Sequence, residues 1–406
     1  MLWRSPVTSN ASKFAPSAPA AWEPVDVAEV AECLISARHQ HRTVNVTGGG
    51  TAATWGGDCQ ATATLRTHKL DSVLRYEPSD MTIQVGSGMP VTDLQSVTAE
   101  HGQRLALDAA RISRGATIGG IFATADQGPA QLAFGGPRDL VIGATLVLAN
   151  GEIAHSGGHV IKNVAGYDLA RLVSGSLGTL AVITDLTFRL HPLPAATGTL
   201  SFDTGIGEAV AYAEAISAAA LDPIAAEWTS GRLLVRFEGT DFGVQERLRV
   251  AAELLGAGKR SILDADESDE AWADHADAST STDTALTTIL RGLVRPTDVF
   301  AVVQAFHRIV HEHDPLPTVA AGLLTGRIDA KVSGSTLATH AEVVGQWRAA
   351  VEAAGGTLTM RERPEGLTDL VDAWGTAPSA AAVMRAVKSA YDPADLLGPG
   401  RFHPWF

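Results

Sequence analysis

Three consecutive glycines, Gly48 to Gly50, follow a short β-branched segment, TVNV, after one threonine, and no other feature restricts the fold of this chain as strongly. Without Cβ atoms, main-chain amides can turn into one concavity and approach an anion closely. Between Val44 and Thr64 the only charged side chain is Asp58, so N–H dipoles rather than a lysine would neutralise a bound phosphate. The segment predicts a pyrophosphate-binding loop, with an ordinary glycine-rich turn as the alternative.

Two other nucleotide-binding motifs do not fit the sequence. A dinucleotide fingerprint needs a long helix after its glycines, and the pair Gly56-Gly57 interrupts any such helix. A Walker A loop needs GxxxxGK[ST], but before Gly258-Lys259 the place of the first glycine is taken by Glu253. Nicotinamide binding in a Rossmann fold and nucleotide hydrolysis are therefore not supported.

The composition is that of a globular chain with more than one domain. With 406 residues, 45% hydrophobic and 19% charged, the chain exceeds the usual size of a single domain, so two are expected. The net charge of −14 argues against a nucleic-acid partner, because phosphate binding relies on an excess of Lys and Arg. With only two cysteines, Cys33 and Cys59, an iron–sulfur cluster held by this chain alone is not expected, and a reducing cytoplasm is favoured.

Residue patterns divide the chain into segments. Residues 1–19 lack the apolar core of a signal peptide and are expected to be a flexible leader, and no apolar run is long enough for direct membrane insertion. Residues 20–194 are rich in glycine and short apolar runs, which predicts an α+β domain opened by a helix that Asp26 caps. Residues 195–390 predict a second α+β domain with an antiparallel sheet and helices on one face. Eight acidic residues and no Lys or Arg lie between Asp264 and Asp283, which is typical of a mobile surface segment.

More glycine motifs follow the first loop in a fixed order: Glu77–Asp80, Gly86–Gly88, Gly115–Thr124, Phe134–Asp139 and Gly175–Ile183. In this order the motifs resemble the FAD-binding domain of the vanillyl-alcohol oxidase and p-cresol methylhydroxylase superfamily, the PCMH-type domain. The resemblance covers residues 20–194 and implies a two-part FAD-binding domain there.

The resemblance implies FAD contacts position by position. The loop at residues 47–52 would wrap the pyrophosphate, residues 115–124 would lie along the ribityl chain and phosphates, and residues 178–183 would touch the ADP half. A bulky side chain at Gly49 is predicted to fill the phosphate concavity. Relatives that attach FAD covalently often carry a histidine just after the first glycines, where this chain has Thr51, so non-covalent FAD is expected. The implied cofactor-binding residues are Thr47, Gly48, Gly49, Gly50, Thr51, Ala52, Gly115, Thr117, Ile118, Gly119, Gly120, Ala123, Thr124, Gly178, Thr179, Ile183 and Arg401.

Within the superfamily the chain resembles the FAD-binding accessory subunit of bacterial glycolate oxidase. Residues 162–180 carry Leu177 where catalytic relatives usually have glutamate, and Tyr391–Phe402 resembles the closing motif of that subunit. In such folds residues 391–406 pack back on the FAD domain, which would bring Arg401 near the flavin. The His-x-Gly-Asp-Gly-Asn-type signature of the catalytic relatives is missing from the sequence, so no metal site is expected and no catalytic residue is assigned.

These features favour an FAD-binding subunit of a glycolate (2-hydroxy acid) oxidase complex that takes part in electron transfer. Its expected partners are a catalytic flavoprotein subunit and an iron–sulfur subunit, with a small hydroxy acid as substrate of the complex. The expected location is the cytoplasm, with any membrane contact made through the partners. The alternatives are a self-sufficient FAD-dependent oxidoreductase acting on another small alcohol or hydroxy acid, and a non-catalytic scaffold that keeps only the FAD fold.

Several side chains outside the glycine motifs have two interpretations. Lys162 and Arg401 would either stabilise negative charge on a reduced flavin or lie at the surface as solvated cations. Tyr167 would either donate a hydrogen bond to substrate or flavin or belong to the core. One helical segment carries three histidines that are expected to be solvent-exposed rather than metal ligands or acid–base groups: His307, His311 and His313.

Overall fold

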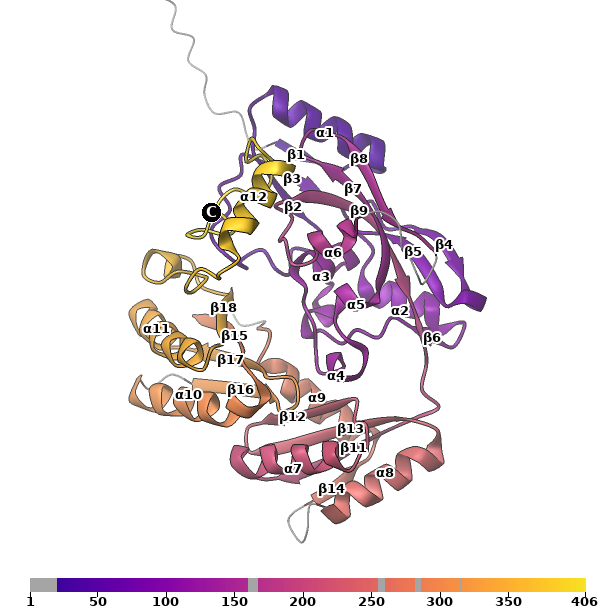
Figure 1. Cartoon of the computed structure of the whole chain (residues 1–406), viewed down its shortest axis with the longest axis vertical. Helices are drawn as coiled ribbons and strands as arrows, with labels where there is room; N and C mark the ends of the chain where they lie inside the picture. The colour runs from indigo at the N-terminus through magenta and orange to yellow at the C-terminus, as the bar shows by residue number, and fades with distance from the viewer. Residues whose placement is uncertain (1–19, 160–166, 255–259, 282–285, 314–315) are drawn as a thin grey trace, which may run out of the picture.

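The computed structural model describes residues 20–159, 167–254, 260–281, 286–313 and 316–406, which form two layered parts (Figure 1). The N-terminal part, at the top of the view, contains a three-stranded and a five-stranded sheet, and the C-terminal part below it is built on one eight-stranded sheet. A short pair of strands, β6 (Gln103–Arg104) and β10 (His191–Pro192), lies where the chain passes from the first part to the second. This arrangement confirms the α+β fold class.

The chain opens on a parallel three-stranded sheet covered by one helix. In sheet order the strands are β1 (Ala20–Trp22), β3 (Ala63–Arg66) and β2 (Val44–Thr47), and the helix is α1 (Val27–His39). As predicted, Asp26 caps α1: its carboxylate accepts the amide of Glu29, and the Glu29 carboxylate accepts the amide of Val25. The cap fixes where α1 begins, and β2 then carries the chain directly to the three glycines.

The five-stranded sheet is antiparallel and carries most of the N-terminal core. Its strands, in sheet order, are β4 (Val73–Glu77), β5 (Thr82–Gly86), β9 (Ala181–Arg189), β7 (Val141–Leu148) and β8 (Ile153–Gly157). Its helices are α2 (Val91–Ala99), α3 (Ile118–Thr124), α4 (Gln131–Phe134), α5 (Pro137–Leu140) and α6 (Leu169–Val173). Buried side chains of α2, α3, α5 and α6 share one apolar cluster with β5, β7 and β9.

The C-terminal sheet is antiparallel throughout. Its strand order is β14 (Arg260–Leu263), β11 (Ala196–Asp203), β13 (Arg232–Gly239), β12 (Ala225–Thr229), β16 (Leu316–Gly322), β17 (Arg327–Ser333), β15 (Thr287–Leu293) and β18 (Thr357–Glu362). One face is apolar and packs against α7 (Ile206–Ala218), α8 (Asp241–Leu254), α10 (Val299–His313) and α11 (Leu337–Ala353). Within the described ranges, no helix combines the length and apolar composition needed to cross a bilayer.

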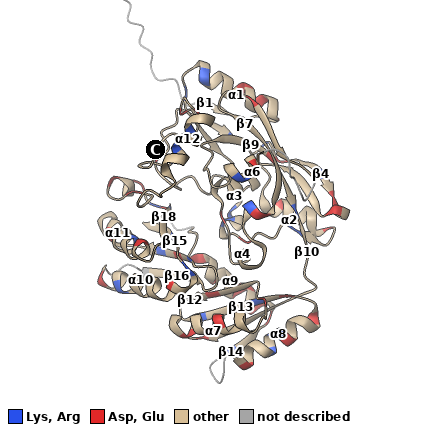
Figure 2. Ribbon diagram, in the orientation of Figure 1, with Lys and Arg blue, Asp and Glu red and all other residues tan. Residues whose placement is uncertain are grey.

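The opposite face of this sheet is charged, because side chains alternate along its strands. On β17, Ile328 and Ala330 enter the apolar core, whereas Arg327 and Asp329 are buried on the other side. On β13, Val235 and Phe237 belong to the same core, and the alternate positions Arg236 and Glu238 are charged. The charged face is turned toward the N-terminal part, as the positions of β12, β13 and β15 indicate (Figures 1 and 2).

The acidic stretch from Asp264 to Asp283 is largely helical, so its prediction as a mobile surface segment was wrong. Helix α9 (Ala265–Asp277) begins at Asp264 with a reciprocal cap, in which Asp264 accepts the Glu267 amide and Glu267 accepts the Asp264 amide. Ala271 and His275 of α9 are buried. The helix lies on the charged side of the sheet, since His275 bonds Glu227 of β12, so the prediction that helices cover one face only was also incomplete.

The end of the chain returns to the N-terminal part, as predicted. Helix α12 (Ala381–Tyr391) lies beside β2 and β3 in Figure 1, and Leu397 forms a bridge with Val44 of β2. The buried ammonium of Lys388 donates to the carbonyl oxygens of Thr179 at 3.0 Å and Leu397 at 2.9 Å, and it pairs with Asp392 at 2.6 Å. This lysine therefore ties the last helix to the loop before β9.

Candidate functional site

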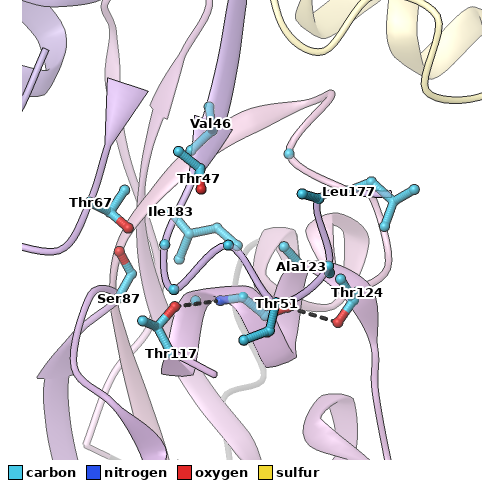
Figure 3. Close-up of a pocket in the computed structure, with 18 of the residues that line it drawn as sticks. Val46, Thr47, Thr51, Thr67, Ser87, Thr117, Ala123, Thr124, Leu177 and Ile183 are labelled. Atoms are coloured by element: carbon cyan, nitrogen blue, oxygen red, sulfur yellow. Dashed lines mark hydrogen bonds between the residues drawn. The ribbon is translucent and has the colours of Figure 1, made fainter. Parts of the chain in front are cut away.

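A pocket opens at the end of β2, where the glycine loop meets the start of α3 and the loop before β9 (Figure 3). It encloses about 800 Å³ of space, part of which is continuous with solvent. Thr67 and Ser87 border one side of the view, and Leu177, Ala123 and Thr124 border the other. Six segments that are distant in sequence thus converge on one cavity.

The glycine loop presents unpaired backbone donors at this pocket. In the described part of the chain, the amide N–H groups of residues 48–52 have no hydrogen-bond acceptor, whereas Ala53 donates to the Gly50 carbonyl and Trp55 to the Ala52 carbonyl, each at 3.1 Å. The space before Gly50 is open, since a Cβ built there would meet no atom within 4 Å. A row of free amides beside an open hollow is suited to binding an anion.

The first two glycines serve a different purpose from the third. A Cβ at Gly48 would lie 2.2 Å from Thr117 Oγ1, and a Cβ at Gly49 would lie 2.2 Å from the carbonyl oxygen of Gly115. A side chain at Gly49 would therefore collide with the loop before α3 rather than fill the concavity, which corrects the sequence-based reason. Thr117 itself is fixed, because its Oγ1 accepts the Gly120 amide at 3.2 Å and caps α3.

The pocket has a buried arginine that the glycine motifs did not predict. The guanidinium of Arg111 donates to Thr51 Oγ1 at 2.8 Å, to Thr124 Oγ1 at 2.9 Å and to the Asp126 carboxylate at 2.9 Å. It also lies 4.2 Å from the ring centre of Trp55. Arg111 thus fixes the glycine loop to the end of α3 and brings a positive charge to the lining. No motif identifies this residue, because its partners are distant in sequence.

Arg401 reaches the same pocket from the C-terminal segment, as predicted. Its guanidinium donates to the carbonyl oxygens of Ala53 at 2.7 Å and Trp55 at 3.0 Å, and to Asn45 Oδ1 at 3.3 Å. The side chain is 7% exposed, so the interpretation as a solvated surface cation does not hold. Burial lowers the pKa of Arg401 from its usual value. Its contacts position the loop that follows the three glycines.

Most of the predicted cofactor-binding residues line this pocket. The exceptions are Gly115, Ile118 and Thr179: Ile118 is in the core, Thr179 donates to the Ser176 carbonyl, and the Gly115 carbonyl packs against Gly49. The predicted residues that do line it are Thr47, Gly48, Gly49, Gly50, Thr51, Ala52, Thr117, Gly119, Gly120, Ala123, Thr124, Gly178, Ile183 and Arg401. Lining residues that sequence reasoning missed are Asn45, Val46, Ala53, Trp55, Thr67, Ser87, Arg111, Leu177 and Ala181.

The remaining sequence candidates do not join the pocket. Lys162 lies outside the described residues, and Tyr167 is 90% exposed, so it is not a core residue. His307 is packed beside the ring of Trp228, and burial lowers its pKa, so full solvent exposure was wrong for this histidine. His313 lies 3.6 Å from the Glu342 carboxylate. Among the described residues, no group of three or more potential metal ligands is found.

A buried set of ion pairs joins the charged face of the C-terminal sheet to the N-terminal part. We call it the arginine–carboxylate network, and its members are Arg111, Arg291, Arg327, Arg361, Asp126, Glu227 and Asp329. A separate, partly exposed pair, Arg236 with Asp108, also joins the two parts. At its centre the Asp126 carboxylate pairs with Arg111, with Arg291 of β15 and with Arg361 of β18. Burial alone would raise the pKa of Asp126, but the three guanidinium groups hold that pKa well below its usual range.

The network also encloses Trp55 of the glycine loop. Two guanidinium groups lie over its indole ring, with the Cζ of Arg111 at 4.2 Å and that of Arg361 at 3.9 Å from the ring centre. Cations above an aromatic face are attracted by its negative π-surface. The two parts of the protein are therefore joined next to the loop that lines the pocket.

Comparisons with known proteins agree with this geometry. Residues 18–157 match the family described as "FAD binding domain". Glycolate oxidase subunit GlcE of Escherichia coli (strain K12) is 31% identical over 198 residues, which are 48% of this chain and 54% of that protein. The uncharacterized FAD-linked oxidoreductase Rv2280 of Mycobacterium tuberculosis (strain ATCC 25618 / H37Rv) is 29% identical over 61% of this chain and 56% of its own length. The chain thus spans about half the length of these curated relatives.

The fold has a solved counterpart over nearly its whole length. An alkyldihydroxyacetonephosphate synthase superposes with a TM-score of 0.70 at 15% identity, covering 93% of this chain and 76% of that one. Identity this low indicates a shared fold only. Together with the family match and the pocket, it leads to one conclusion: the N-terminal part of this chain is an FAD-binding domain of the PCMH type, and FAD is its cofactor.

Proposed function

We propose that this protein is the FAD-binding subunit of a 2-hydroxy acid oxidase complex of the glycolate oxidase type. The observation that carries the proposal is the row of free amides at residues 48–52 beside the open pocket, in a chain similar to glycolate oxidase subunit GlcE. FAD supplies hydride acceptance and onward electron transfer when it is bound.

Different residues of the pocket would bind different parts of the cofactor. The amides of residues 48–52 would hold the pyrophosphate and neutralise its charge through N–H dipoles. Residues of α3 and its N-cap, of the loop before β9 and of β9 would line the rest of the cofactor: Thr117, Gly119, Gly120, Ala123, Thr124, Gly178 and Ile183. Arg111 places a fixed positive charge at the lining, and such charges stabilise negative charge that develops on a bound group. Arg401 acts through the loop that it positions.

Non-covalent retention of FAD is part of the proposal. Among the described residues that line the pocket there is no histidine, cysteine, lysine or tyrosine. The hydroxyl of Thr51, at the position next to the glycines, already accepts a hydrogen bond from Arg111. The lining therefore binds the cofactor by hydrogen bonds and packing.

The partners and substrate of the complex follow from the same proposal. Relatives of this chain include glycolate oxidase subunit GlcD of Bacillus subtilis (strain 168), 36% identical over 37% of this chain, and a D-lactate dehydrogenase of Archaeoglobus fulgidus, 34% identical over 42%. We propose a catalytic flavoprotein subunit and an iron–sulfur subunit as partners, and a small 2-hydroxy acid as the substrate of the assembly. The cytoplasm is the proposed location.

The test compares the purified chain with the assembled complex. The visible absorption spectrum of the purified chain is expected to contain flavin bands. After denaturation and filtration, all the flavin is expected in the protein-free filtrate. With FAD and a dye acceptor, the chain alone is expected to leave glycolate and lactate unoxidised, and activity is expected once the partner subunits are added.

Two outcomes would replace the proposal. Oxidation of a hydroxy acid by the isolated chain at an ordinary enzyme rate would make it a self-sufficient oxidoreductase. A colourless chain whose melting temperature does not rise with FAD would make it a scaffold, because a ligand that binds only the folded state must raise stability.

A further inference from the structure

The loop that follows β2 has two halves with different surroundings. Residues 48–52 carry the free amides at the FAD pocket, whereas residues 53–58 run along the C-terminal part and the chain end. Thr54 Oγ1 donates to the carbonyl oxygen of Arg361 on β18 at 3.3 Å. The amides that line the pocket are therefore only a few residues away from contacts with the second part of the protein.

Asp58 fastens the far end of this loop to the segment that follows β18. One oxygen of its carboxylate accepts a hydrogen bond from the Arg363 guanidinium at 2.6 Å, and the other accepts one from Thr368 Oγ1 at 2.5 Å. We call these three residues the loop clasp. The hydrogen bond from Thr368 and the charge of Arg363 lower the pKa of Asp58 from its usual value, so the clasped form is the ionised carboxylate.

The two donors of the loop clasp are fixed within the C-terminal part, whereas Asp58 is not. The side chain of Arg363 is only 5% exposed. Thr368 lies in a short 3₁₀ helix, Leu367–Asp369, whose first residue is fully buried in the apolar core of that part. The side chain of Asp58 is 66% exposed, so it has little packing of its own and its position depends on these two donors.

The backbone of the loop needs such an anchor. Gly56, with a φ of +73°, and Gly57 precede the clasp, and glycine loses more conformational freedom on ordering than any other residue. Arg111 holds the loop at its first half through Thr51. An anchor at the second half limits the positions that the amides of residues 48–52 can adopt, and a site ordered in advance binds its ligand more tightly.

We propose that Asp58 is a positioning residue for FAD: through Arg363 and Thr368 it fixes the glycine loop to the C-terminal part, so that tight FAD binding requires the two parts to be docked. None of the three residues lines the FAD pocket, so they act on the cofactor through the loop. The proposal rests on the assignment of the pyrophosphate to residues 48–52 in the function proposed above. It gives the C-terminal part a role in retaining the cofactor.

The first measurement is the Kd for FAD of the full-length, FAD-free protein, by flavin fluorescence titration. The Kd is expected to rise at least about fivefold in D58A, which loses both hydrogen bonds of the clasp, and at least about threefold in R363Q and T368V, which lose one each. In the D58A background, R363Q is expected to change the Kd by less than about twofold, because Arg363 acts through Asp58.

Two matched controls remove similar contacts elsewhere. R104Q breaks another ion pair between the two parts, Arg104 with Glu238, which lies at the strand pair β6–β10 rather than at the loop (Figure 1). T204V removes a hydroxyl that donates to a carboxylate within the C-terminal part, as Thr368 donates to Asp58. The Kd for FAD is expected to change less than about twofold in both controls.

Hydrogen exchange gives a second readout, which a purely structural role would not move. Binding and docking stabilise each other by thermodynamic linkage, so FAD is expected to slow amide exchange at residues 366–371, next to Thr368, in the wild-type protein. In D58A the addition of FAD is expected to leave exchange there unchanged. Peptides from α7, which has no contact with the clasp, are the internal reference.

The results separate this role from the proposed function. An unchanged Kd in D58A overturns the positioning role, as does an equal loss of affinity in R104Q or the absence of any FAD effect on exchange at residues 366–371. If R363Q does not fold, D58A decides, because the exposed Asp58 side chain contributes little to packing. The variant G49A tells the two proposals apart: if it weakens FAD binding while D58A does not, only the positioning role fails, and if it leaves the Kd unchanged, the assignment of the pyrophosphate to the loop fails.

Discussion

Replacing Gly49 by alanine is expected to remove FAD affinity while leaving the fold intact. The new Cβ would lie 2.2 Å from the Gly115 carbonyl oxygen, whereas ordinary contacts begin near 3.4 Å, so the glycine loop has to move by more than about 1 Å. A shift of that size takes the free amides of residues 48–52 out of hydrogen-bonding geometry with a bound pyrophosphate. The backbone carbonyl of Gly115 cannot rotate away as a side chain would, so the glycine loop has to move instead.

The size of the effect follows from the hydrogen bonds that are lost. A hydrogen bond to a charged group contributes about 1.5–3 kcal/mol, so losing two such bonds to the pyrophosphate weakens binding by about 3 kcal/mol or more, roughly a hundredfold or greater in Kd. Flavin fluorescence titration of the FAD-free protein measures the Kd directly. Retention of yellow colour through gel filtration gives a second measure of the same loss.

The matched control is Gly345→Ala. Gly345 lies within α11, far from the loop in the fold, and a Cβ there would meet no atom within 4 Å. Alanine in a helix interior is more favourable than glycine by about 1 kcal/mol, so this variant is expected to keep full FAD affinity and slightly higher stability. If G49A binds FAD as tightly as G345A does, the assignment of the pyrophosphate to this loop is refuted.

Further predictions concern the ion pairs, the caps and the chain end. Asp126→Asn leaves three buried guanidinium groups without their shared carboxylate and is expected to lower the free energy of urea unfolding by about 3–5 kcal/mol. The pKa of Asp126 is lowered in the folded state, so the ionised carboxylate contributes its full stabilisation above the unfolded pKa of about 3.9. That stabilisation is lost progressively as the pH falls below this value. In that range the free energy of unfolding of the wild-type protein is therefore expected to drop more steeply than that of D126N. Glu267→Ala removes one half of the α9 cap and is expected to cost about 1 kcal/mol by the same measurement, with Glu270→Ala as the uncapped control. Lys388→Met is expected to release the C-terminal segment from the N-terminal part. Limited proteolysis followed by mass spectrometry would then detect faster cleavage after residue 391 than in the wild-type protein. Equal cleavage rates would contradict the role of this lysine.

Local patterns predicted the parts of the site that depend on backbone. The glycine triplet after TVNV marked the loop with the free amides, and the motif from Gly115 to Thr124 marked the segment that forms α3. These signals are readable because a close backbone approach demands glycine whatever surrounds it. The reason given for Gly49 was wrong, however, because a sequence does not state which neighbour a missing Cβ would touch.

Charged side chains on strands were harder to interpret. The alternation in RIDAKVS at Arg327–Ser333 predicts a strand with one apolar and one charged face, and a charged face normally meets solvent. In this protein that face is buried against the N-terminal part and supplies Arg291, Arg327 and Asp329 to the network. The period of a pattern determines which residues share a face, but it carries no information about what covers the face.

By itself, then, the sequence determined the α+β elements and the cap at Asp26. Its resemblance to a known family added the cofactor class and the return of the chain end. Only the tertiary structure decided the setting of Arg111 and the approach of two guanidinium groups to Trp55. The physical reason is distance along the chain: Asp126 pairs with Arg291 and Arg361, 165 and 235 residues away. Glycine and capping requirements act within a few neighbouring residues, whereas a buried ion pair exists only once the whole fold has brought its members together.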